Sequence, residues 1–378
     1  MGEARQSRQD QEVFQDLKNL YIHFPFCRRK CSYCALRSRA GITEEERAAY
    51  VSALVRAVES SGDSGFKTVY FGGGTPALCD LGPLLEAVAP RLGEGAEFTV
   101  ELNPLDVAPA CLATLKSGGV NRISMGLQSV DDAVLADMRR GYGFAEAERA
   151  FYLVREYFEN VGVDLIVGYP GELGALYPRH ARLAKWGLKH CSVYSLILEE
   201  KTPLYRRCRG RNAGGAVPLP DDDTVMNRLA TVASFMEDIG LERYEISNYA
   251  SPGYECRHNT AVWRGEDYLG LGDGAHGRTG RLRTRNAWSC REPFTDAAPP
   301  LSWSLAPETE TVSEEADRKE RAVFALRTRE GIDADAFPGW RGITDKFVAE
   351  GLMEEKGSFR ILTARGMEVC DSIIGELI

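Results

Sequence analysis

Short apolar runs alternate with amphipathic segments along the first half of the chain. The apolar runs have the length and the β-branched or aromatic content of buried strands, and we expect strands at 20–24, 67–71, 97–102, 121–125, 161–167 and 191–198. Helical patterns separate them, roughly at 44–60, 80–92, 107–117, 131–158 and 172–186. A capping box from Thr43 to Glu46 marks the start of the first helix. This order predicts an α/β fold with a parallel sheet, helices outside it, and ligand-binding groups at the carboxyl ends of the strands.

The alternation weakens after residue 200. A basic, Gly-rich surface loop is expected at 206–220, a helix at 221–240, and a Pro-rich boundary at 297–307. Beyond the boundary, helices at 313–329 and 343–351, a hairpin at 352–362 and a last helix at 363–378 predict a small winged-helix-like module.

Composition narrows the class of protein. With 378 residues, 44% hydrophobic and 27% charged, the chain resembles a globular protein with one large domain and a smaller one. The net charge of −9 argues against broad nucleic-acid binding. The sequence contains no run of 18 apolar residues, so it predicts no membrane span, although peripheral association stays open. The polar N-terminus is unlike a secretory signal, so the ten cysteines imply a reducing compartment, the cytoplasm.

Three cysteines carry the strongest chemical signal. Cys27, Cys31 and Cys34 form a C-x3-C-x2-C cluster that must project from one short loop. Three thiolates at this range suit an iron–sulfur cubane with one iron left open for a small molecule. Structural zinc and a redox Cys31–Cys34 pair are the alternatives on spacing alone, but the other seven cysteines are scattered and Cys27 would be idle.

The blocks around this cluster resemble a known superfamily. The run YIHFPFCRRKCSYC and the glycine-rich VYFGGGTP resemble the radical S-adenosylmethionine (SAM) superfamily. VELNP, GVNRISMGLQS, VDLIVGYPGE, YEISNYA and LGLGDGAHGR follow in order and are similar to the oxygen-independent coproporphyrinogen oxidase group, from residue 21 to about 278. Leu36 stands where the oxidases typically carry a fourth cysteine, and ECRHN with LGLGDGAHGR looks most like the HemW branch of haem chaperones.

The resemblance implies an architecture and cofactors. It implies a partial (β/α)6 TIM-like barrel at 19–200, after a polar lead-in at 1–18. A family-specific extension at 201–300 would close the active site, and the winged-helix-like domain would occupy 307–378. In that superfamily SAM chelates the open iron of a 4Fe-4S cluster, and an electron cleaves SAM to a 5′-deoxyadenosyl radical.

Site residues are carried over one at a time. Cys27, Cys31 and Cys34 match the cluster ligands. The residues that match SAM-binding or neighbouring positions are Tyr21, Tyr33, Gly73, Gly74, Thr75, Glu101, Gln128, Arg140 and Asp164, the last three at positions that contact a second SAM in the oxidases. Glycines there would allow close backbone approach to SAM. The competing interpretations are a plain turn for the glycines, a solvated strand end for Glu101 and a structural cap for Asp164.

The haem ligand is less marked. His258, in ECRHNTAVW, matches the histidine of the HemW motif, with Cys256 as a competitor and a satisfied structural histidine as the alternative. Three departures from the family pattern, at Val262, Asp273 and Ala35-Leu36, indicate a divergent member of the family.

Two functions from different classes remain. The chain is either a chaperone that binds haem and delivers it to recipient haemoproteins, or a catalyst that decarboxylates coproporphyrinogen III or acts as a SAM-dependent methylase or cyclopropanase. Both imply a 4Fe-4S cluster, SAM and a reductant such as flavodoxin or ferredoxin. The missing fourth cysteine favours the chaperone. The catalyst remains an alternative because the chain retains Gln128, Arg140 and Asp164.

Overall fold

One curved sheet organises the chain. The computed structural model describes residues 17–172, 180–210, 216–287, 289–290, 303–304 and 307–378. Within these residues the main sheet has the order β7-β8-β6-β5-β4-β3-β2-β1-β9. Its six central strands run parallel in chain order: β1 (Asn19–Phe24), β2 (Phe66–Gly73), β3 (Leu92–Leu102), β4 (Arg122–Gln128), β5 (Asn160–Val167) and β6 (His190–Ser195). The expected α/β fold with a partial (β/α)6 barrel is confirmed.

The segment after residue 200 extends this sheet at both edges. The short strand β9 (Leu269–Leu271) pairs in parallel with β1, about 250 residues away along the chain. At the other edge, β8 (Asn248–Ala250) pairs antiparallel with β6, and β7 (Glu242–Arg243) follows it. These pairings cover edges that would otherwise expose unpaired backbone groups.

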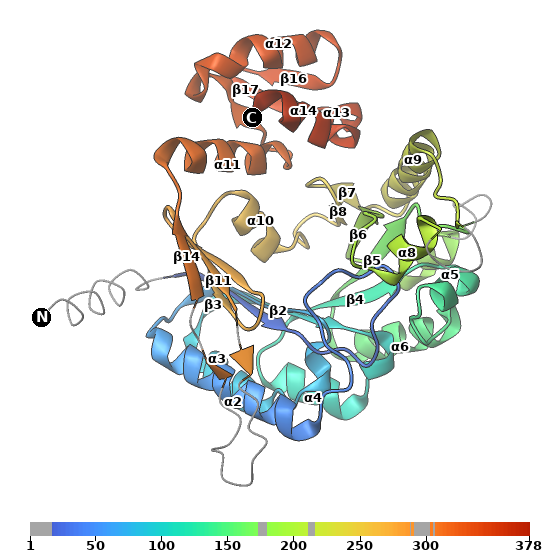
Figure 1. Cartoon of the computed structure of the whole chain (residues 1–378), viewed down its shortest axis with the longest axis vertical. Helices are drawn as coiled ribbons and strands as arrows, with labels where there is room; N and C mark the ends of the chain where they lie inside the picture. The colour runs from blue at the N-terminus through green and yellow to red at the C-terminus, as the bar shows by residue number, and fades with distance from the viewer. Residues whose placement is uncertain (1–16, 173–179, 211–215, 288, 291–302, 305–306) are drawn as a thin grey trace, which may run out of the picture.

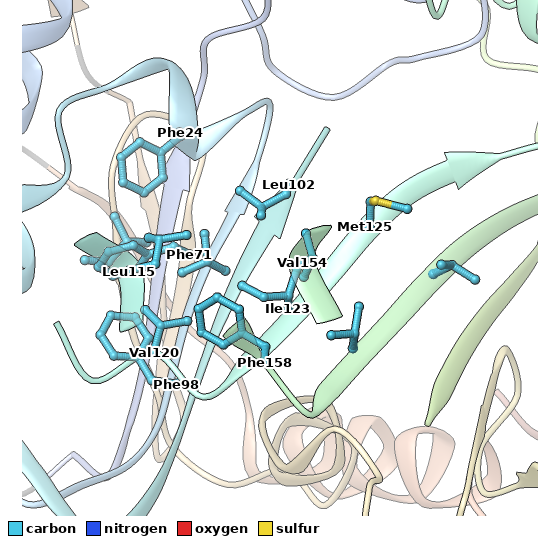
Figure 2. Close-up of a cluster of buried hydrophobic side chains, with 14 of the residues drawn as sticks. Phe24, Phe71, Phe98, Leu102, Leu115, Val120, Ile123, Met125, Val154 and Phe158 are labelled. Atoms are coloured by element: carbon cyan, nitrogen blue, oxygen red, sulfur yellow. The ribbon is translucent and has the colours of Figure 1, made fainter. Parts of the chain in front are cut away.

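Helices cover one face of the sheet. Figure 1 shows α2 (Glu44–Ser61), α3 (Gly82–Val88), α4 (Pro109–Ser117) and α6 (Phe144–Tyr157) side by side there. The predicted capping box is present, because Thr43 Oγ1 accepts the Glu46 N–H and the Glu46 carboxylate accepts the Thr43 N–H. Leu115 of α4 and Val154 of α6 pack against Phe71, Phe98 and Ile123 of the strands, as Figure 2 shows. Burial of this apolar layer is the main driving force for the fold.

Alternation along the strands separates this core from the barrel interior. In β1, Ile22 and Phe24 are fully buried towards the helices, whereas Tyr21 and His23 project the other way. The same period places Tyr70, Glu101, Ser124, Asp164 and Ser192 inside the barrel. A functional cavity can therefore form without interrupting the core.

Several predicted boundaries were wrong. The helix expected at 131–158 is divided into α5 (Asp132–Asp137) and α6, because Arg139 (φ 62°) and Gly141 (φ 81°) take left-handed conformations that a helix cannot contain. The strand expected at 191–198 ends at Ser195, and α8 (Pro203–Cys208) occupies the start of the loop expected at 206–220. Of the helix expected at 172–186, residues 173–179 lie outside the described residues and Ala181–Trp186 is a 3-10 helix.

The remaining elements form two groups. Helices α9 (Asp222–Asp238) and α10 (Arg257–Trp263) follow the barrel, and β10 (His276–Thr279), β11 (Leu282–Asn286) and β14 (Pro307–Thr311) make a small antiparallel sheet. A two-stranded pairing joins β12 (Ser289–Cys290) to β13 (Trp303–Ser304).

The C-terminal module has a core of its own. It comprises α11 (Glu314–Leu326), β15 (Ile332–Asp333), α12 (Arg341–Ala349), β16 (Met353–Lys356), β17 (Phe359–Leu362), α13 (Ala364–Glu368) and α14 (Cys370–Leu377). Leu326, Phe347 and Ile373 lie at its centre. The two helices and the hairpin appear where they were expected, but the last helix breaks at Val369. In the described part of the chain no helix has the length and apolarity needed to span a bilayer.

Candidate cofactor site at the carboxyl ends of the strands

A cavity of about 540 Å³ opens at the carboxyl ends of the barrel strands. Ligand sites of parallel α/β sheets are expected at this end. Eleven of the thirteen residues predicted from the sequence line it: Cys27, Cys31, Tyr33, Cys34, Gly73, Gly74, Thr75, Glu101, Gln128, Arg140 and Asp164. They come from segments up to 137 residues apart, so the fold brings together what the sequence motifs only suggested.

The cysteine loop is tied down along its length. The Cys27 N–H donates to the Arg39 carbonyl at 2.9 Å, and the Arg39 N–H donates to the Pro25 carbonyl at 2.7 Å. In the middle of the loop, the Ser32 N–H donates to the Met138 carbonyl at 3.1 Å. The Ser32 hydroxyl is also hydrogen-bonded to the Tyr169 hydroxyl at 2.8 Å. These contacts give the three cysteines a defined platform.

The donor set fits an iron–sulfur cluster. Cys27, Cys31 and Cys34 are partly exposed to the cavity, and Arg140 donates to the Cys31 sulfur at 3.2 Å. Among the described residues no three His, Cys, Asp or Glu side chains close around one point, as the ligands of a single ion would. In a cubane each cysteine binds a different iron, so its sulfurs are spread around the cluster. Three thiols from one loop, with a cation beside one of them, fit that arrangement.

The glycine-rich loop touches the cysteine loop directly. A Cβ on Gly74 would lie 2.4 Å from the Phe26 carbonyl oxygen, and the Gly74 N–H already donates to the Phe24 carbonyl at 2.7 Å. At Gly73 the backbone has φ 105°, and a Cβ would lie 2.5 Å from the His23 ring. Glycine is therefore required here first by the packing of the two loops.

Glu101 lies beside the glycine loop. Its carboxylate accepts the Tyr70 hydroxyl at 2.8 Å and the Gly73 N–H at 3.0 Å. Burial, and then the nearby Asp164, raise the pKa of Glu101 to about 7. Burial likewise raises the pKa of Asp164, whose carboxylate accepts the Ser124 hydroxyl at 3.1 Å. This pair of carboxylates is poised to receive a cation in the cavity.

Gln128 and Arg140 close the far side of the cavity. Gln128 has φ 70° directly after a register irregularity in β4, a backbone conformation that costs a non-glycine residue of the order of 1–2 kcal/mol. Arg140 is buried, and it donates to the Gly126 carbonyl at 2.7 Å and to the Tyr142 hydroxyl at 2.9 Å. Strain and a buried cation beside a cavity are typical of a functional site.

Asp273, a departure from the family pattern, has a structural role. Its buried carboxylate pairs with Arg37 at 2.6 Å and with Arg39 at 3.8 Å, just beyond the third cysteine. Its N–H donates to the Tyr50 hydroxyl, which in turn donates to the His23 carbonyl. Asp273 thus anchors the exit of the cysteine loop to the barrel.

Two predicted site residues lie outside the cavity lining. Tyr21 lies deeper in the barrel, where its hydroxyl is 3.0 Å from His23 Nδ1 and its ring stacks on His258. His258 is buried in the floor of the barrel, with Nδ1 2.8 Å from the Thr68 hydroxyl. Burial lowers the pKa of His258 to about 3. These contacts favour the structural interpretation of His258, and its assignment as a haem ligand stays a prediction.

Several lining residues were missed from the sequence. Tyr70 donates a hydrogen bond to Glu101, and Asp106 accepts one from Arg28. Tyr194 and Ile197 form part of the cavity mouth. Tyr70 was detectable, because it shares the inward face of β2 with Thr68. Ile197 carried no signal, since it follows the end of β6.

Comparisons with known proteins agree with this geometry. Residues 21–184 match the family model described as the Radical SAM superfamily. The protein named Heme chaperone HemW in Mycobacterium tuberculosis strain H37Rv is 32% identical over 375 residues, covering 95% of this chain and 94% of that protein. The Heme chaperone HemW of Bacillus subtilis strain 168 is 31% identical, with 96% and 100% covered.

Among solved structures, the coproporphyrinogen III oxidase HemN of Escherichia coli, a radical SAM enzyme, superposes with a TM-score of 0.77. The superposition covers 97% of this chain and 92% of the HemN chain, at 18% sequence identity. At this identity the likeness concerns the fold alone.

Proposed function

The chain belongs to the HemW family of the radical SAM superfamily, and from this membership we propose that it is a haem chaperone that carries a 4Fe-4S cluster and binds SAM. One observation supports the proposal above all others. A single cavity gathers the three cysteines, the glycine loop and Glu101, and exposed apolar side chains line part of its mouth. That arrangement offers a soft-metal site, a cation-binding site and an apolar platform at one end of the barrel.

Each group of residues has a defined task in this proposal. When bound, the cluster and SAM supply one-electron radical chemistry. Cys27, Cys31 and Cys34 would hold three irons, and Arg140 would donate a hydrogen bond to the Cys31 sulfur. The carboxylates of Glu101 and Asp164 would face the positive charge of SAM and accept hydrogen bonds from its amino group. Gly73 and Gly74 would let the glycine loop pack closely against the cysteine loop.

Affinity for SAM should rise with pH. Protonated Glu101 is neutral and loses its electrostatic attraction for the positively charged SAM, and its pKa of about 7 places the transition near neutrality. We expect the Kd of SAM to be about tenfold higher at pH 6 than at pH 8, since only the ionised fraction is competent to bind. Calorimetric titration of the cluster-loaded protein measures it. Glu101→Gln should bind weakly with a flat profile, and an unchanged pH dependence in that variant would assign the titration to another group.

The mouth of the cavity suits a flat apolar ligand. Of the nine large hydrophobic side chains exposed in the described residues, four line this cavity: Leu36 (54% exposed), Leu105 (38%), Tyr194 (42%) and Ile197 (71%). Exposed apolar side chains gathered around one opening indicate a binding surface. We propose that haem binds at this mouth, where these side chains would supply apolar contacts to it.

A negative charge introduced among these apolar side chains should therefore weaken haem binding. Ile197→Glu replaces the most exposed apolar side chain by a carboxylate, and we expect haem affinity to fall about tenfold or more. Phe359→Glu is the matched control, because Phe359 is 44% exposed but lies on β17 of the C-terminal module. Haem titration followed by absorbance decides the point. Equal affinity in both variants would contradict this location.

The same assay tests the two remaining questions. Because His258 is buried and hydrogen-bonded, we expect His258→Ala to reduce haem affinity less than Ile197→Glu. Loss of haem in His258→Ala alone would restore His258 as the ligand. Formation of protoporphyrinogen from coproporphyrinogen III, SAM and a reductant would overturn the chaperone proposal in favour of an oxidase.

The partners follow from this function. We propose recipient haemoproteins, a one-electron reductant and a cytoplasmic location, with no role for nucleic acid. The net charge of −9 argues against nucleic-acid binding, and the ten cysteines suit a reducing compartment.

A further inference from the structure

A basic groove lies on the outer side of the cysteine loop. The residues between the first two cysteines, Arg28, Arg29 and Lys30, are all exposed, and so is Arg139 after α5. All four line the cavity on one side and an open groove of about 990 Å³ on the other. The cysteine loop is thus a wall one chain thick, with the predicted cluster inside and a positive surface outside.

The positive charge of this groove is only partly neutralised. Arg28 pairs with Asp106. In the part of the chain that the structure describes, Arg29, Lys30 and Arg139 have no recorded ion pair. The acidic residues of the groove are engaged locally: Asp132 accepts the Phe144 N–H at 2.6 Å.

Glu146 is engaged in the same way. It accepts the Gly143 N–H at 2.9 Å and pairs with Arg149 at 3.1 Å. Because four cationic side chains and two carboxylates line it, the groove carries net positive charge on a chain of net charge −9, a local reversal that would attract an acidic partner.

Arg29 packs against a glycine, Gly141, whose backbone is in the left-handed conformation. Its guanidinium lies against Gly141, where a Cβ would be 2.9 Å from the Arg29 Cζ. Gly141 has φ 81° at the break between α5 and α6. The helix break that sequence patterns did not predict thus creates room for a cation beside the cysteine loop.

We propose that this groove binds a small acidic one-electron carrier protein, such as a flavodoxin or ferredoxin, and that the electron enters through the Arg28–Lys30 wall. The inference rests on the proposed function, because SAM cleavage consumes one electron for each event. The carrier is oxidised by one electron and the cluster is reduced by one, with no bond made or broken. Entry from the outer side leaves the cavity mouth free for SAM and haem.

The test is the rate at which a reduced flavodoxin reduces the cluster. The protein is loaded with cluster and compared with the triple variant Arg29→Gln, Lys30→Gln, Arg139→Gln, by stopped-flow absorbance without SAM or haem. We expect the rate to fall at least tenfold at low salt, and its salt dependence to become shallower. Reduction by dithionite, a small anion that needs no docking, should fall by a much smaller factor. The Kd of the oxidised flavodoxin complex should rise in parallel.

The matched control neutralises three exposed cations elsewhere, Arg56, Lys356 and Arg365, and should leave the rate unchanged. If the triple variant fails to hold its cluster, Arg139→Gln alone is measured, because Arg139 lies outside the cysteine loop. Equal rates and equal salt dependence in variant and wild type would overturn the proposal. Loss of haem affinity with normal reduction by flavodoxin would also overturn it, and would assign the cations to the haem carboxylates.

Failure of the proposed function is distinguishable from failure of this inference. A wild-type protein that binds no haem would refute the chaperone proposal. The reduction rates of wild type and triple variant would still test the groove as the docking site.

Discussion

Serine at Cys27, Cys31 or Cys34 will abolish the iron–sulfur cluster, each substitution alone being sufficient. The three thiols lie on one loop and line the same cavity, and none of the other six cysteines whose side chains the structure describes lines it. A serine oxygen is a hard donor that binds iron in this setting far less well than a thiolate. We expect cluster iron and sulfide to fall to background after anaerobic reconstitution, and SAM affinity to fall with them. Iron analysis and electron paramagnetic resonance of the reduced protein measure the loss.

Cys111→Ser and Cys208→Ser are the matched controls. Both residues are partly exposed, on α4 and α8, and neither lines the cavity. They should retain a full cluster. The loaded wild type should also melt at a higher temperature than its Cys31→Ser variant, since a group bound only by the folded state stabilises it. Full iron content in any of the three ligand variants would refute the assignment of that cysteine.

Much of the fold could be predicted because its signals are local. Each central strand is an apolar run, and Thr43 with Glu46 marked the start of α2 correctly. Breaks in helices were harder to predict. The 131–158 segment has helical periodicity throughout, yet Arg139 and Gly141 adopt left-handed conformations that no local pattern announced. The edge strands β8 and β9 were missed because three-residue strands depend on partners distant in the sequence.

The sequence predicted which residues form the candidate site, but not how deep in the barrel each of them lies. Motif order identified the family, which the comparisons confirm, and eleven of thirteen named residues line one cavity. Tyr21 carries a motif signal as strong as the others and His258 a weaker one, but both lie towards the floor of the barrel. Sequence spacing shows which strand a residue joins, and it does not show how far along the barrel axis that residue lies. Asp273 illustrates a further limit, because its partners Arg37 and Arg39 are more than 230 residues away.

Alanine at Gly74 should disrupt the site through the backbone alone. The new Cβ would lie 2.4 Å from the Phe26 carbonyl oxygen and 2.8 Å from that of Phe24, and neither atom can rotate away as a side chain would. The glycine loop and the cysteine loop must therefore separate by several tenths of an ångström. We expect the free energy of unfolding to fall by about 1–3 kcal/mol. SAM affinity should fall at least tenfold, because small displacements of positioning groups have large effects.

The cluster itself should survive in Gly74→Ala, since its three ligands are unchanged, and this separates the two large effects. Gly342→Ala is the control: Gly342 lies in α12 with nothing within 4 Å of its added Cβ, and alanine in a helix stabilises it slightly. Thermal melting and SAM titration of the loaded proteins compare the pair. If Gly74→Ala matched wild type in both, the contact between the two loops would not control SAM binding. If it lost iron as completely as Cys31→Ser, the glycine loop would be holding the cluster loop in place, because no iron ligand has changed.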